Sequence, residues 1–212
     1  MIMADGAVRT ERAQATRDAI LTAAERLFAE HGVITVSNRQ ISEAAGQGNN
    51  TAVGYHFGAK ADLVRAIVHK HQTQIERLRE AMAADAADSI DLRVWVACLV
   101  RPATGHLEGL GNPTWYARFA AQVLADPELR TVMIDEALNS PSLRTVVDGY
   151  NRCLPDLPAP IRAERDDMAL HLIVQMTAER ERALAENRPT PRSSWHDAAT
   201  GLIDAIVGIM RA

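Results

Sequence analysis

The sequence predicts an all-α protein, because both its composition and its spacing of apolar residues favour helices. Ala, Leu, Arg and Glu are abundant, whereas aromatic residues make up only 4% of the 212 residues. Apolar residues recur three and four positions apart along most of the chain, and Gly or Pro separates these stretches. With 47% apolar and 24% charged residues, the chain is long enough to form one or two folded domains.

The first predicted helix covers residues 10–31. Its apolar face consists of Ile20, Ala24, Leu27 and Phe28. Gly32 follows, and glycine often ends a helix because it adopts a positive φ at little cost. Arg9, Arg12 and Arg17 are candidates for an arm that reaches a minor groove, although a solvated helix start is the favoured interpretation for Arg17.

The second predicted helix, residues 37–45, has a strong start signal. Ser37 and Gln40 have the spacing of a capping box, in which each side chain accepts a hydrogen bond from a backbone N–H of the other residue. Val36 and Ile41 occupy the two positions of a hydrophobic staple. Since a helix of about nine residues is unstable alone, it is expected to pack on its neighbours.

A third short helix is predicted over residues 50–57, after a turn at Gln47 and Gly48. Asn49 is a natural N-cap for it, and Gly58 ends it. Residues 50–55 are small or able to form hydrogen bonds, and none is acidic. A slim, polar helix of this kind fits a DNA major groove, which is about 12 Å wide, so the sequence predicts a helix-turn-helix.

The rest of the chain is predicted to be helical as well. A fourth helix starts near residue 59 and runs into the low 80s, and Pro102 should kink or split the helix that follows it. The remaining predicted helices cover residues 90–109, 113–125, 128–139, 141–153, 161–187 and 193–211.

Charge and cysteine content exclude several classes of protein. The net charge is −4, and residues 1–60 contain six basic and six acidic residues, so charge alone indicates no nucleic-acid partner. Cys98 and Cys153 are isolated, which predicts reduced thiols rather than a metal site or a disulfide. The longest apolar run, residues 94–100, is too short to cross a bilayer, and no signal peptide is visible. We therefore expect a cytoplasmic protein without membrane contact.

Three segments of the N-terminal region resemble the TetR family of bacterial repressors. They read AILTAAERLFAEHG, VSNRQISEAAG and NNTAVGYHFGAKADLV, and together they lie within about residues 16–64. The resemblance implies a helix-turn-helix DNA-binding domain at residues 10–58. It also implies a helical-bundle domain at residues 59–212 that binds an effector and forms a homodimer.

The resemblance also implies which residues contact double-stranded DNA. Arg39 would pair with a guanine or a phosphate, Tyr55 and His56 with phosphates, and Lys60 with a phosphate at the start of the fourth helix. The alternatives are a solvated Arg39 and a packed His56. The full predicted set is Arg39, Asn49, Asn50, Thr51, Ala52, Tyr55, His56 and Lys60. The chain departs from the family pattern at Gly54, where tyrosine is common, and in having one extra residue after Gly46.

An effector pocket and a dimer interface are expected in the second domain. Effectors in this family bind between the middle helices, so the pocket is expected among Trp95, His106, Trp115, Phe119, Met133, His171 and Gln175, although such residues are more often core. The last two helices are expected to pair with those of a second subunit through Leu172, Trp195, Ala199, Leu202, Ile206 and Ile209. The alternative is that this stripe only closes the core of the monomer.

Taken with the resemblance, these patterns predict a ligand-responsive transcriptional regulator. The expected mechanism is a repressor released from a palindromic operator by a small, largely apolar effector, and activation stays open. One alternative is a helical-bundle enzyme or carrier for a lipophilic molecule, although the sequence contains no recognisable catalytic, metal or cofactor motif. Another is a DNA-binding protein without sequence preference, which the neutral head disfavours.

Overall fold

The computed structural model describes residues 2–49, 51–154 and 157–212, with side chains described from residue 10 onward. These residues form helices and no strands, as predicted. The helices are α1 (Ile2–His31), α2 (Asn38–Ala44), α3 (Ala52–Phe57), α4 (Lys60–Asp85), α5 (Leu92–Leu110), α6 (Tyr116–Ala125), α7 (Pro127–Leu138), α8 (Pro141–Arg152), α9 (Ala159–Ala185) and α10 (Trp195–Arg211). Within the described residues, no helix is both long and apolar enough to span a membrane.

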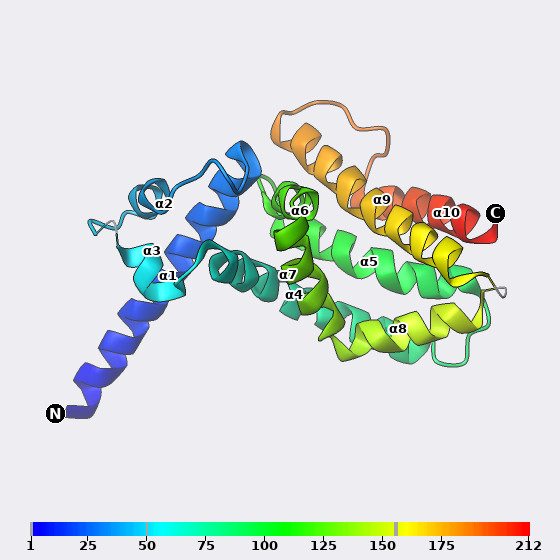
Figure 1. Ribbon diagram of the computed structural model, residues 1–212, viewed down its shortest axis with the longest axis horizontal. Coiled ribbons are helices and arrows are strands. Elements are labelled where there is room, and N and C mark those ends of the chain that lie inside the picture. The colour runs from blue at the N-terminus through cyan, green and yellow to red at the C-terminus, as the bar shows by residue number, and fades with distance from the viewer. Residues whose placement is uncertain (1, 50, 155–156) are drawn as a thin grey trace.

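The helices form a small head and a larger body (Figure 1). The head consists of α1, α2 and α3, and the N-terminal part of α1 projects beyond it. The body contains α5, α8, α9 and α10 packed lengthwise, while α4 runs from the head into the body and α6 and α7 lie near the junction. A loop between α9 and α10 stands out from the body.

The start of α2 confirms the capping box. The Gln40 backbone N–H donates to the Ser37 hydroxyl oxygen at 3.3 Å, and the Ser37 N–H donates to Gln40 Oε1 at 2.9 Å. Val36 and Ile41 are both buried, as the staple requires. The seven-residue helix therefore has both its first turn and its inner face fixed by local sequence.

Two hydrophobic cores lie along the molecule. The first combines residues of α1, α2, α3 and α4 with residues of α6 and α7, and Phe28 stacks on Phe119 within it, with ring centroids 6.2 Å apart. The second is formed mainly by α5, α8 and α10, with Ala83 from α4 and Ala169 from α9, and contains the fully buried Trp95. Because the first core contains residues on both sides of position 58, the head is packed directly on the body.

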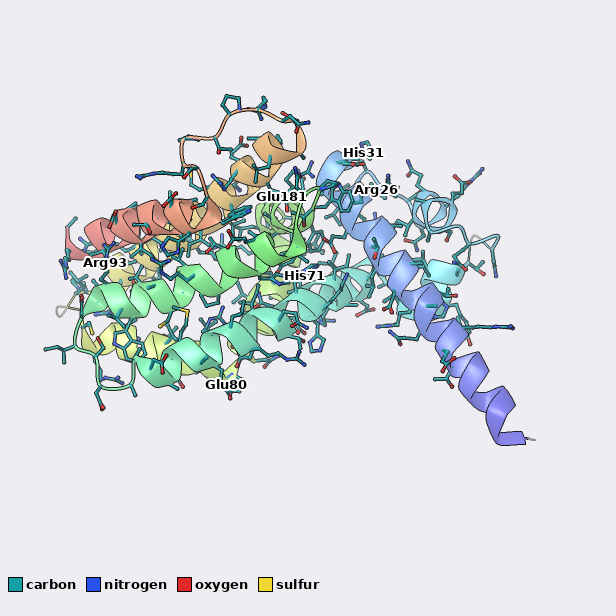
Figure 2. The ribbon with its side chains drawn as sticks, turned by 180° about the vertical axis from the view of Figure 1, so that it is seen from behind. Arg26, His31, His71, Glu80, Arg93 and Glu181 are labelled. Carbon is teal, nitrogen blue, oxygen red and sulfur yellow. The ribbon has the colours of Figure 1, made fainter. Side chains whose placement is uncertain are left out.

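A buried carboxylate joins α9 to the first turn of α6. Glu181, labelled in Figure 2, is 1% exposed and accepts hydrogen bonds from the backbone N–H groups of Ala117 and Arg118, both at 3.0 Å. The Arg118 guanidinium pairs with the same carboxylate at 3.0 Å. Two otherwise free N–H groups of α6 are thus satisfied by a side chain from another helix.

Three predictions about helices need correction. α1 begins at Ile2 rather than near residue 10, and α3 begins at Ala52 rather than at residue 50. Pro102 does not split α5, which is continuous and packs on α4 and α10. This packing outweighs the backbone hydrogen bond that proline removes. The other predicted helices agree with the structure to within a few residues.

Candidate DNA-binding site

The short helix α3 presents one face to the core and another to solvent. Val53 and Phe57 are buried against the head, whereas Thr51, Gly54 and Tyr55 are exposed, with Tyr55 84% exposed. A β-carbon added at Gly54 would meet no atom within 4 Å. The outer face of α3 is therefore slim, polar and open to a ligand as large as a duplex.

Arg17 fixes the end of α3 to α1. Its Nη1 donates to the carbonyl oxygen of His56 at 2.9 Å, and its guanidinium carbon lies 4.1 Å from the centroid of the Phe57 ring. Neither expected role for Arg17, a solvated helix start or a groove-reaching arm, describes this position. Local sequence patterns could not predict this contact, because Arg17 and His56 are 39 residues apart.

Arg39 lies on the exposed side of α2, and Glu43 orients it. The Nε of Arg39 donates to Glu43 Oε1 at 2.8 Å, and 73% of the Arg39 side chain is exposed. The hydrogen bond with Glu43 raises the pKa of Arg39. The two terminal nitrogens, which form the fork that matches guanine O6 and N7, are not part of this bond.

The turn before α3 is longer than predicted. Asn49 does not cap a helix starting at residue 50; its Oδ1 accepts hydrogen bonds from the Thr51 N–H at 2.9 Å and the Thr51 hydroxyl at 2.7 Å. Asn50 lies outside the described residues. Ala52 is half-buried and packs against the core, which leaves its methyl group less available to a base than expected.

His56 and Lys60 are partly packed. The ring of His56 is half-buried beside the rings of Tyr55 and Phe57, at centroid distances of 5.2 and 6.4 Å. Lys60 Nζ donates to the carbonyl oxygens of Val33 at 2.9 Å and Val36 at 2.7 Å, and a third contact reaches Ile34 at 3.4 Å.

The phosphate contact expected for Lys60 is therefore not what this structure presents. Its ammonium group bonds the loop between α1 and α2, and it has only three hydrogens to donate. In addition, Asp62 Oδ2 accepts a hydrogen bond from the Ala59 N–H at 3.2 Å, so a carboxylate already occupies the start of α4. An anion at that position would meet this negative charge.

The residues expected to line one effector pocket do not come together. Trp95 belongs to the second core, whereas Phe119 and Met133 belong to the first. His171 is half-exposed and bonds the carbonyl oxygen of Asp167 on its own helix, and Gln175 is exposed. Trp115 lines an open groove between α1 and α2 instead. The predicted set is thus divided between two cores, an open groove and the outer side of α9.

His106 lies in a buried polar cluster at the junction of head and body. His71 from α4, labelled in Figure 2, bonds Glu25 Oε2 of α1 through Nε2 at 2.9 Å and His106 Nε2 of α5 through Nδ1 at 2.7 Å. The ring of Tyr116 from α6 stacks on His71 at 3.8 Å. We call these four residues the junction cluster.

Two arrangements of protons satisfy both hydrogen bonds of the junction cluster. In each, His71 donates from Nε2 to the Glu25 carboxylate; its Nδ1 either accepts the Nε2 proton of His106 or, in a protonated His71, donates to an unprotonated His106 Nε2. A neutral His106 fits both. Burial, together with the charge of His71, lowers the pKa of His106 from 6.5 to about 4. Sequence reasoning did not predict the junction cluster, because His71 and His106 are 35 residues apart and no local pattern joins them.

The predicted dimer stripe is mostly internal. Within the single subunit, Trp195, Ala199, Leu202 and Ile206 are all at least nine-tenths buried, and α10 packs mainly on α5. This matches the alternative in which the stripe closes the core of the monomer. Leu172 and Ile209 are partly exposed, and Met168 and Met176 on α9 are about half exposed, so apolar surface remains on the outer side.

A capped short helix, a connecting turn and a second short helix with an open polar face define the head as a helix-turn-helix unit. Residues 20–67, which include most of this head and the start of α4, match the sequence model described as "Bacterial regulatory proteins, tetR family".

Two curated relatives match an 81-residue segment at 37% identity. They are the HTH-type transcriptional regulator TtgR and the probable HTH-type transcriptional regulator ArpR, both of Pseudomonas putida. In both cases the match covers 38% of this chain and 38% of the relative. The likeness in sequence is thus limited to part of each protein.

Solved structures resemble nearly the whole chain in fold. A TetR family regulator from Marinobacter aquaeolei has a TM-score of 0.58 at 19% identity and covers 92% of this chain and 97% of its own. PfmR from Thermus thermophilus has a TM-score of 0.54 at 18% identity, covering 89% and 97%. LfrR from Mycobacterium smegmatis, in complex with proflavine, has a TM-score of 0.51 at 19% identity, covering 93% and 98%.

Proposed function

We propose that the protein is a transcriptional regulator that binds a specific DNA site as a homodimer and responds to a small molecule. The observation that supports this function most is the outward face of α3, which is polar and open and is held rigidly by Arg17 and by the buried Val53 and Phe57. The match of residues 20–67 to DNA-binding regulators supports the same function. A DNA partner would be consistent with the cytoplasmic location expected from the sequence.

The proposed reading surface consists of the exposed parts of α2, α3 and the turn between them. Arg39, oriented by Glu43, pairs with guanine, and Thr51 contacts a neighbouring base. Tyr55 and His56 contact phosphates, which fix the register of the head without reading sequence. The exposed Asn49, in the turn before α3, extends this surface.

A dimer supplies two such heads. We assign the interface to the outer side of α9 and α10, where apolar side chains remain exposed, rather than to the internal stripe. The residues proposed for it are Met168, Leu172, Ala205 and Ile209. Two heads about 34 Å apart read two half-sites of a palindrome, which gives the selectivity that one short helix lacks.

Repression relieved by an effector is the proposed mode of regulation. We place the boundary between the two proposed domains near residue 58, where α3 ends and α4 leads into the body. LfrR, a neighbour in fold, binds proflavine, which supports a ligand-responsive body. A ligand changes DNA affinity only if it binds the two states of the dimer differently.

Selection of bound duplexes from a random library tests the proposal. We expect enrichment of a palindrome by the wild-type dimer. Arg39→Ala should weaken binding to that palindrome by about 1–3 kcal/mol and relax one base pair in each half-site. Arg77→Ala removes an exposed arginine from α4, outside the head, and should leave the selected sequence unchanged. If the wild-type protein enriches no sequence, the proposed function is wrong.

A further inference from the structure

Glu43 is the one acidic residue in the sequence of residues 37–58, which contains α2, α3 and the turn between them. It lies on the outer face of α2, and 55% of its side chain is exposed. Four residues before it is Arg39, the one arginine or lysine of the same segment. DNA is a polyanion, so a carboxylate on the surface that meets it lowers the affinity for any duplex, whatever its sequence. The effect of Glu43 on Arg39 explains why a carboxylate is useful at this position.

The bond with Glu43 affects the two possible DNA contacts of Arg39 differently. Nε of Arg39 donates to Glu43 Oε1 at 2.8 Å, and the terminal nitrogens of the guanidinium lie outside this bond. A guanine is recognised by the direction of two donors toward O6 and N7, so a guanidinium held at Nε keeps the fork that reads it. A phosphate is attracted mainly by charge, and the carboxylate beside the guanidinium cancels much of that charge. Glu43 therefore weakens a phosphate contact of Arg39 more than a guanine contact.

Two other cations of the head are also bound by groups of the chain itself. Arg17 donates to the carbonyl oxygen of His56 at 2.9 Å, and Lys60 donates to two carbonyl oxygens of the loop between α1 and α2, at 2.9 and 2.7 Å. Each bond makes its cation less available to a phosphate. Since contacts with phosphates provide most of the affinity for random sequence, these three cations add little to it. The pairing of Arg39 with Glu43 thus agrees with the arrangement of charge elsewhere in the head.

We propose that Glu43 is a specificity-determining residue, which positions Arg39 for a guanine edge and keeps it from serving as a phosphate contact. The inference rests on the proposed function, because it requires that the outer face of α2 meets DNA. Glu43 lowers the affinity for random sequence and thereby raises the ratio of specific to non-specific affinity. That ratio, rather than the affinity alone, decides whether a regulator occupies its own site among many competing ones.

A purely structural role for Glu43 is the competing explanation. Ion pairs between residues four positions apart on an exposed helix face usually stabilise the helix only slightly. In that case, removal of the carboxylate would change the affinities for all duplexes by the same factor. The two explanations therefore differ in the ratio of two affinities.

Fluorescence anisotropy with two duplexes tests the proposal: the palindrome that the wild-type protein selects, and a random duplex of the same length. Glu43→Ala should lower the ratio of the two affinities by about tenfold, through weaker recognition of guanine and tighter binding of the random duplex. If Arg39 becomes a phosphate contact in each of two heads, the salt slope for the random duplex should steepen by about two. Glu43→Gln keeps an oxygen that accepts from Nε, so it should retain the preference for guanine better than Glu43→Ala does.

Two controls separate the effect on Arg39 from the general effect of charge. Glu30→Ala removes the same charge from an exposed position on α1 and should leave the ratio as in wild type. In an Arg39→Ala background, Glu43→Ala should change neither the ratio nor the salt slope, because no guanidinium is left to release. Alanine favours helix and position 43 is exposed, so the variants should fold, which circular dichroism checks.

The outcomes distinguish this inference from the proposed function. The proposal is overturned if Glu43→Ala changes both affinities by the same factor, or if it steepens the salt slope equally without Arg39. A palindrome that wild type and Glu43→Ala read with the same preference would refute this inference alone. A wild-type protein that selects no palindrome would refute the proposed function, and the role of Glu43 with it.

Discussion

The two cores of the molecule are stabilised by different interactions. The core between α5, α8 and α10 is built around apolar side chains such as Trp95, Ile203 and Ile206. The junction between head and body contains the same kind of apolar packing but adds the junction cluster, in which two hydrogen bonds connect three helices. Apolar packing depends on shape alone, whereas the junction also depends on protonation and on the direction of each hydrogen bond.

The largest expected effect comes from disturbing shape in the apolar core. A β-carbon at Gly149 would lie 2.4 Å from three atoms of the Trp95 ring, and that ring is fully buried and donates to the carbonyl oxygen of Ser89 at 3.0 Å. Gly149→Ala should therefore lower the free energy of unfolding by about 3 kcal/mol in urea titrations. In the control, Gly109→Ala adds a β-carbon in open space on α5 and should be neutral or stabilising by up to about 1 kcal/mol.

The junction cluster should make stability depend on pH. Below pH 6.5 the unfolded chain takes up a proton on His106 that the folded protein binds only near pH 4, because burial holds the pKa there. The free energy of unfolding should therefore fall as the pH is lowered from about 6.5 to about 4, by about 3 kcal/mol in all.

Comparison of variants isolates the contribution of His106 to that pH dependence. His106→Gln should reduce the slope of stability against pH between 6.5 and 4, while His196→Gln, at an exposed position on α10, should leave it as in wild type. Parallel slopes for His106→Gln and wild type would mean that the neutral imidazole does not contribute.

The smallest of these effects concerns Lys60, the second polar link near the junction. Lys60→Met removes the hydrogen bonds to the loop carbonyls and should lower the free energy of unfolding by about 1–3 kcal/mol. The DNA affinity of the Lys60→Met variant should fall by the same factor at every salt concentration. A decrease of about one in the salt slope of binding would instead identify Lys60 as a phosphate contact and contradict the structural role.

The same contrast explains what could be predicted from the sequence. The capping box of Ser37 and Gln40 lies within four residues, so local sequence was enough to place α2. The contacts of Lys60 with carbonyl groups and of His71 with His106 join residues 24 or more positions apart, and no local pattern encodes them. The residues expected around the effector illustrate the same limit: residue type indicated burial, but only tertiary packing assigned Trp95 and Phe119 to separate cores.

The carboxylate of Glu181 has a consequence for motion. If α9 slid along its axis, the first turn of α6 would have to follow, because otherwise a buried negative charge would lose its backbone and guanidinium partners at a cost of several kcal/mol. Since α6 also packs on α1, a displacement of α9 would be passed through α6 to α1. In the proposed dimer, a shift of α9 against the partner subunit would therefore change the tilt of the head.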